Sequence, residues 1–102
     1  MKTNDATTVI FRKFKEGDII ALFPYEIDNY HGDCMSYMHV GQHSGANYFG
    51  CIKGTKPAKK EEYQNLYNEL LSIGYKPEVK QKINMHTYVK VMGIFHKKYF
   101  NI

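Results

Sequence analysis

The sequence has no tryptophan, two cysteines and three prolines in 102 residues. The two cysteines, Cys34 and Cys51, are too few for a disulfide scaffold, and we expect both to be packed thiols. Linkers, internal repeats and low-complexity tracts are also lacking, which argues against a modular or disordered chain. We therefore expect residues 1–102 to form a single domain, with residues 1–6 as a frayed N-terminus.

Long apolar runs and a large excess of one charge are lacking as well. No stretch approaches the ~18 uncharged apolar residues that a membrane-spanning helix needs. Met1–Asp5 leads into no apolar signal-peptide region, so we expect a cytoplasmic protein without membrane contact. Lysine and arginine outnumber acidic residues by 14 to 10, which gives a net charge of +4. This mild surplus is compatible with nucleic-acid binding but does not imply it.

Known catalytic motifs are lacking too. The chain has no phosphate-binding glycine loop, dinucleotide fingerprint, serine elbow or helix-borne metalloprotease motif. An enzyme would have to use Cys34 as a nucleophile, with a base supplied by His31, His39 or His43. Nothing in the spacing fixes that geometry, so we favour a protein without enzymatic activity.

What the chain does contain is a pattern of strands. Residues 7–14 are rich in β-branched and aromatic side chains, and residues 19–23 form an apolar run. The turn Lys15–Asp18 between them predicts a β-hairpin, and Pro24 is expected to end its second strand. Residues 34–40 alternate and predict a third strand, with Cys34, Ser36, Met38 and Val40 on one face and Met35, Tyr37 and His39 on the other.

The segments after the third strand are less regular. Residues 41–47 are polar and contain two glycines, which predicts a loop. Residues 48–52 are apolar and could return as a strand or cover a helix. Residues 77–83 alternate and predict a further strand. In residues 85–95 the β-branched side chains favour a strand, although the apolar residues also fit helical spacing. We treat residues 84–102 as a C-terminal extension whose structure the sequence does not settle.

The strongest local signal is a helix at about Pro57 to Ile73. Thr55 is expected to cap its start, and Gly74 is placed to close its end. Its apolar stripe consists of Tyr63, Leu66, Tyr67, Leu70 and Leu71. The chain is thus expected to be an α+β domain: a mostly antiparallel sheet of four to five strands with one amphipathic helix on one face, in the order β-β-β-α-β.

Several short stretches together form a recognisable pattern. They are Val9–Arg12, Ile20–Pro24, Ser36–His43, Pro57-Ala58 and Glu62-Tyr63. Together they resemble a family of small, uncharacterised proteins of bacteriophages and other bacterial mobile elements. The resemblance covers about residues 8–83 and is most specific in Ala21–Pro24 and Tyr37–His43. It implies a non-enzymatic accessory protein that binds a host or phage macromolecule, and it carries over no functional residue.

The candidate binding residues surround Gly41. Aromatic, imidazole, amide and hydroxyl groups occur within eight residues, as they do in many binding loops. They are Tyr37, His39, Gln42, His43 and Ser44. We expect them to contact a partner protein; the alternative is a loop whose side chains satisfy their own backbone.

Two further kinds of ligand were considered. Cys34, His39, His43 and Cys51 have the chemistry of zinc ligands, but their spacing matches no known zinc motif, so we expect no metal and no cofactor. Nucleic-acid contact is an alternative because lysines neutralise phosphates. The residues in question are Lys56, Lys59, Lys60, Lys97 and Lys98, together with Arg12, Lys13 and Lys15.

Overall fold

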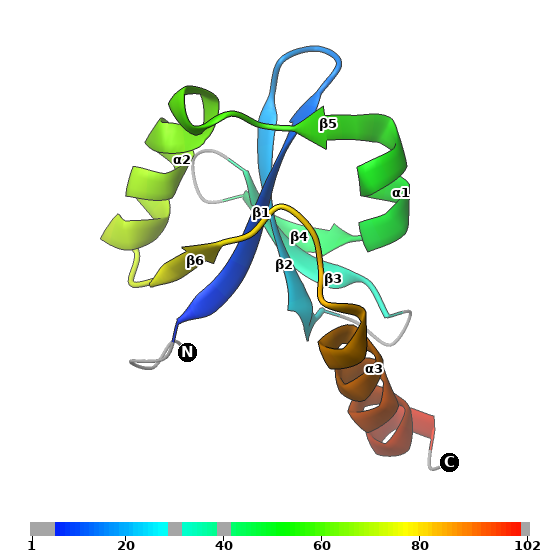
Figure 1. Ribbon diagram of the computed structural model, residues 1–102. Helices are drawn as coiled ribbons and strands as arrows, with labels where there is room; N and C mark the ends of the chain where they lie inside the picture. The colour runs from blue at the N-terminus through cyan, green and yellow to red at the C-terminus, as the bar shows by residue number, and fades with distance from the viewer. Residues whose placement is uncertain (1–5, 29–31, 39–41, 101–102) are drawn as a thin grey trace.

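A computed structural model describes residues 6–28, 32–38 and 42–100 of the chain (Figure 1). Residues 1–5, which are part of the expected frayed end, lie outside this range. The elements are β1 Thr7–Phe14, β2 Ile19–Ile27, β3 Cys34–Met38, β4 Gln42–Ala46, α1 Tyr48–Gly54, β5 Thr55–Pro57, α2 Lys60–Ser72, β6 Pro77–Val79 and α3 Met85–Phe100. Among these residues no helix combines the length and apolar character that crossing a bilayer requires.

The strands form one sheet in the order β4-β3-β2-β1-β5, with every neighbouring pair antiparallel. The outer edge of β1 is shared between two partners. Its first residues, Thr7–Val9, pair in parallel with β6, and Arg12–Phe14 pair with β5. The expected α+β class with a mostly antiparallel sheet is thus confirmed.

The first hairpin is formed as the sequence predicts. Gly17 has φ +106°, which a residue with a side chain rarely adopts, and the Phe14 amide donates to the Asp18 carbonyl at 2.8 Å. The expectation that Pro24 ends the second strand is wrong, because β2 continues to Ile27. The pairing of β2 with β3 shifts register between Phe23 and Ile27, and such an irregularity accommodates a residue that has no amide donor.

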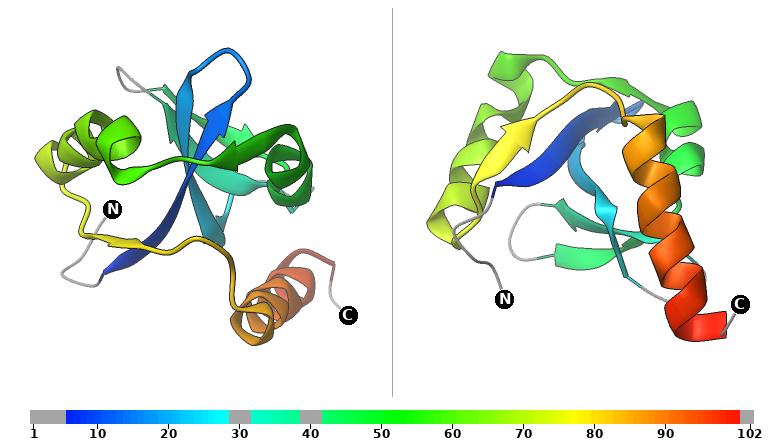
Figure 2. Two further views of the ribbon diagram at one scale, coloured as in Figure 1. Left: turned by 45° about the horizontal axis from the view of Figure 1, so that its top comes forward. Right: turned by 60° about the horizontal axis from the view of Figure 1, so that its bottom comes forward.

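Two apolar clusters cover opposite faces of the sheet, and Figures 1 and 2 show α2 and α1 on opposite sides of it. On the α2 side, Leu66 and Leu70 pack against the odd-numbered residues of β1 and β2 and against Tyr37. The Phe11 ring stacks on Tyr63 with centroids 4.2 Å apart. The α1-side cluster contains Ile10, Ile20, Leu22, Cys34 and Tyr48. The alternation expected for residues 34–38 agrees with this division.

Helix α2 begins later than expected. Pro57 belongs to β5, so the helix begins at Lys60, and the Lys59 amide donates to Glu62 Oε1 at 2.8 Å. Thr55 does not cap α2, because its hydroxyl donates to the Cys51 carbonyl at the end of α1. The reason is tertiary: residues 55–57 pair with β1 and are held in an extended conformation.

The end of α2 was predicted correctly. Gly74 has φ +105°, and its amide donates to the Leu71 carbonyl at 3.1 Å. The Tyr75 amide donates to the Leu70 carbonyl at 3.0 Å, which completes a Schellman motif. The Tyr75 ring then stacks on Phe23 at a centroid distance of 5.0 Å. The chain therefore reverses at Gly74 and enters β6.

Two segments between β3 and β5 differ from the expectation. The predicted loop 41–47 contains strand β4, which pairs with β3. Residues 48–54 form helix α1 rather than a strand, and they cover the face of the sheet opposite α2. The side chain of Asn47 caps this helix by accepting the Gly50 amide at 2.7 Å.

The preference for a strand after Asn84 is wrong, because Met85–Phe100 form helix α3. The Asn84 side chain accepts the Thr87 amide at 3.1 Å and so caps the helix. The Asn84 amide donates to the hydroxyl of Tyr25 at 2.7 Å, which ties the start of α3 to β2. Figure 1 shows α3 projecting beyond the sheet.

Candidate functional site

Of the five expected binding residues, the structure describes the side chains of Tyr37 and Ser44. The Tyr37 side chain is 1% exposed, and its hydroxyl donates to the carboxylate of Glu69 on α2. Tyr37 is therefore part of the core between the sheet and α2. Ser44 is exposed on β4, and its carbonyl accepts the Ser36 hydroxyl at 2.8 Å.

The other three expected binding residues are described in part or not at all. The backbone of Gln42 and His43 belongs to β4, opposite Met38 and Tyr37 of β3. The side chains of Gln42 and His43, and all of His39, lie outside the described residues. The described residues of the expected binding segment therefore belong to the antiparallel strands β3 and β4.

Cys34 is poorly suited to nucleophilic chemistry. Its side chain is 2% exposed, and burial, followed by the influence of Cys51, raises the pKa of the Cys34 thiol to about 12. Burial also raises the pKa of Cys51, and both cysteines are free. Nucleophilic attack requires the thiolate, so neither residue is activated at neutral pH. Among the described residues, no group of three or more His, Cys, Asp and Glu side chains could hold a metal ion.

The raised pKa of Cys34 predicts slow alkylation. In a Cys51→Ser variant, iodoacetamide at about pH 8 should modify Cys34 roughly a hundredfold or more slowly in the native state than in urea. Burial, the largest cause of the raised pKa, remains in this variant and keeps the thiol almost fully protonated. Mass spectrometry of quenched samples measures both rates. Equal rates would mean an accessible thiolate and would favour the enzyme hypothesis.

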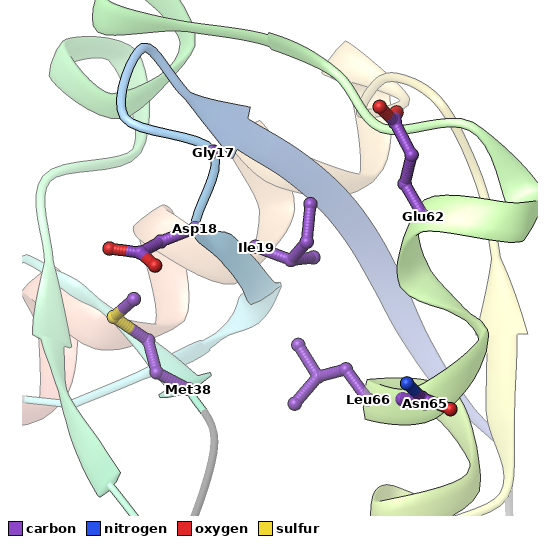
Figure 3. A pocket seen from close by; sticks show the side chains of 7 residues that line it. All are labelled: Gly17, Asp18, Ile19, Met38, Glu62, Asn65 and Leu66. Atoms are coloured by element: carbon purple, nitrogen blue, oxygen red, sulfur yellow. The ribbon is translucent and has the colours of Figure 1, made fainter.

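A cleft of about 420 Å³ opens beside the expected binding segment (Figure 3). Its walls come from the β1–β2 turn, the end of β3 and the first half of α2. In Figure 3, Met38 and Leu66 lie on opposite sides of the view, with Ile19 above and between them, and the end of the Met38 side chain lies below the Asp18 carboxylate. The lining residues are Gly17, Asp18, Ile19, Met38, Glu62, Asn65 and Leu66. The cleft thus has apolar walls and a polar rim.

The rim of the cleft carries negative charge. The Glu62 carboxylate accepts from Lys13 Nζ at 2.5 Å, and this bond and the one from the Lys59 amide lower the pKa of Glu62. Asp18, which is exposed on the turn, makes no ion pair with any described residue. Asn65 adds an exposed amide. Such a rim suits a partner group that carries positive charge next to an apolar side chain.

The lysines proposed for nucleic-acid contact lie on different parts of the structure. Lys59 and Lys60 lie exposed at the start of α2, Lys97 is exposed on α3, and the side chain of Lys98 lies outside the described residues. Lys56 instead joins a second hollow, of about 410 Å³, which we call the lysine hollow. It is lined by Lys13, Phe14, Lys15, Lys53, Gly54, Thr55 and Lys56.

Comparisons with models of protein families, with curated proteins and with solved structures found no match. The function is therefore inferred from the residues of this chain. The sequence pattern did not single out Asp18, Asn65 or Lys53, because the cleft and the lysine hollow arise where distant segments meet. For the cleft, the local signal was the predicted turn at Lys15–Asp18. For the lysine hollow, the sequence had named Lys13, Lys15 and Lys56 as candidate nucleic-acid contacts.

Proposed function

We propose that the chain is a non-enzymatic interaction protein that binds a segment of another protein in the cleft between the β1–β2 turn, β3 and α2. The observation that carries this proposal is the combination of apolar walls with the carboxylate of Asp18 at the rim, which pairs with no cation among the residues that the structure describes. The resemblance to phage and mobile-element proteins supports a host or phage partner in the bacterial cytoplasm.

The dimensions and chemistry of the cleft favour a short peptide segment. Its volume of about 420 Å³ lies in the range of sites that enclose a small ligand, so one or two side chains of a partner fit. An apolar partner side chain would pack between Met38 and Leu66, and a neighbouring lysine or arginine would approach Asp18. Gln42 pairs with Met38, so the expected binding strand β4 adjoins the cleft.

Charge reversal at the rim tests the proposal. We would select peptides from a displayed random library on the wild-type protein and measure the affinity of a selected peptide by fluorescence anisotropy. Asp18→Lys should weaken binding roughly tenfold or more, because an attraction becomes a repulsion. The selected sequences should combine lysine or arginine with an adjacent apolar residue.

Glu16→Lys is the matched control. Glu16 is exposed on the same turn and lies outside the cleft lining, and its replacement changes the net charge by the same amount. This variant should bind the peptide about as the wild-type protein does. If both variants lose affinity equally, or if selection yields acidic peptides, the cleft is not the binding site.

A further inference from the structure

The lysine hollow lies on the other face of the β1–β2 hairpin from the cleft. Phe14 of the hollow packs in the α1-side cluster, whereas Ile19 of the cleft packs in the α2-side cluster. The lysines come from β1, from the β1–β2 turn, from the end of α1 and from β5. They form two groups, Lys13 with Lys15 and Lys53 with Lys56, which are distant in the sequence and meet where β5 pairs with β1.

Arg12 of β1 holds together the segments that line the lysine hollow. This residue is 7% exposed, and its guanidinium donates to the Ile52 carbonyl at 3.0 Å and the Thr55 carbonyl at 2.8 Å. Its Nε donates to Thr55 Oγ1 at 2.9 Å. The end of α1 and the start of β5 are thereby held against β1, and the backbone that carries Lys53 and Lys56 is held with them.

The positive charges of the lysine hollow are only partly balanced. Lys13 pairs with Glu62 at 2.5 Å, but Lys15, Lys53 and Lys56 are exposed and make no ion pair with any described residue. Lys13 and Lys56 stand directly opposite each other on β1 and β5, and like charges in this position are destabilising. A lysine at position 53 is favoured in part because it lies in the last turn of α1, at the negative end of the helix dipole. The helix dipole does not explain why positive charges also stand at positions 15 and 56, because neither Lys15 nor Lys56 belongs to α1.

We propose that the lysine hollow binds the phosphate backbone of a single-stranded nucleic acid. Lys15, Lys53 and Lys56, which pair with no carboxylate in the described part of the chain, would neutralise successive phosphates. The volume of about 410 Å³ accommodates a short stretch of backbone. Phe14, which is half-buried at the wall of the hollow, offers an aromatic surface on which an unpaired base can stack. The lysine hollow shares no lining residue with the cleft, and an ion pair between Lys13 and Glu62 connects the two. The proposal does not depend on the proposed protein partner.

An anionic membrane has the same phosphate chemistry but fits the lysine hollow less well. Peripheral membrane binding combines lysines with apolar side chains that insert into the bilayer. The lysines here surround a concavity, and its large apolar side chain, Phe14, is half-buried within it. A flexible single strand can follow a concave surface that a bilayer does not enter.

The test compares two triple variants of equal charge. In Lys15→Gln/Lys53→Gln/Lys56→Gln the hollow loses its unpaired lysines, and in Lys76→Gln/Lys80→Gln/Lys90→Gln three exposed lysines elsewhere are replaced. The probe is a fluorescein-labelled oligothymidine of about 15 nucleotides, read by anisotropy at several salt concentrations. We expect the hollow variant to bind roughly tenfold or more weakly than wild type at low salt. The plot of log affinity against log salt should lose about 2 units of slope, from three phosphates at about 0.7 each.

The control variant should keep the wild-type slope and bind within about threefold of wild type.

Phe14→Leu keeps an apolar wall and should weaken binding by about tenfold without changing the slope, because stacking is not an ionic contact. Thermal unfolding checks that each variant is folded, and the single variant Lys53→Gln serves if the triple variant is not. Absence of oligonucleotide binding by the wild-type protein would overturn the proposal. Equal losses in both triple variants, or tighter binding to phosphatidylserine vesicles that depends on the same lysines, would also overturn it.

Discussion

Replacing Leu70 by alanine should lower the free energy of unfolding by about 2–5 kcal/mol, the range found for buried leucines that leave a cavity. Leu70 is 0% exposed and belongs to the cluster that joins α2 to the sheet. Its neighbours there include Phe23 and Tyr37, which are themselves almost completely buried, so the surrounding side chains have little freedom to fill the space. Urea unfolding followed by tyrosine fluorescence measures the change.

Leu71→Ala is the matched control for this prediction. Leu71 is the next residue of α2, but its side chain is 47% exposed, so the same substitution creates no closed cavity. We expect a loss of about 0.5 kcal/mol or less, as for most surface substitutions. Because alanine has the higher helix propensity, any larger loss at Leu71 would show that the exposed side of α2 contributes to packing. Similar losses at both positions would contradict the orientation of the helix.

The orientation of α2 is a feature that the sequence predicts well. Tyr63, Leu66 and Leu70 recur at helical spacing, and the structure places all three against the sheet. Leu71, which was assigned to the same stripe, lies at its margin and is half-exposed. The hairpin at Gly17 and the end of α2 at Gly74 were also predicted, because a glycine with positive φ marks a local turn.

Helices α1 and α3 show where local signals were insufficient. α1 contains Gly50 and Gly54, which have low helix propensity, and α3 contains β-branched residues that favour strands. Each helix has an asparagine cap, Asn47 or Asn84, which stabilises its first turn. The sequence interpretation considered apolar periodicity and β-propensity in these segments but not their caps.

The candidate sites depended on contacts between distant residues. Alternation placed Tyr37 on one face of its strand with Met35 and His39, but alternation alone does not tell which face meets a helix or whether a tyrosine is buried. The structure buries it because α2 crosses that face and Glu69 accepts its hydroxyl. Arg12 was counted among surface cations for a similar reason: its acceptors, at Ile52 and Thr55, are at least 40 residues away in the sequence. No local pattern identifies such partners.

Arg12→Met should therefore destabilise the fold by about 2–4 kcal/mol, because a buried group left without its hydrogen bond costs about 1–3 kcal/mol. The substitution keeps an apolar stem of similar length but leaves the carbonyls of Ile52 and Thr55 without their donor. Burial lowers the pKa of Arg12, yet an arginine remains protonated in a protein, so the charge is lost as well. Urea unfolding measures the loss, and amide exchange at Ala58, which donates to the Phe11 carbonyl, reports on the pairing of this segment with β1.

Two controls separate the hydrogen bonds of Arg12 from its charge. Arg12→Lys keeps the charge but lacks the planar fork that serves several acceptors at once, so most of the loss should remain. Lys56→Met removes one charge from β5 at an exposed position and should change stability by about 0.5 kcal/mol or less. If Arg12→Lys were as stable as the wild-type protein, the charge alone would account for the effect. The close attachment of α1 and β5 to β1, on which the lysine hollow depends, would then need another cause.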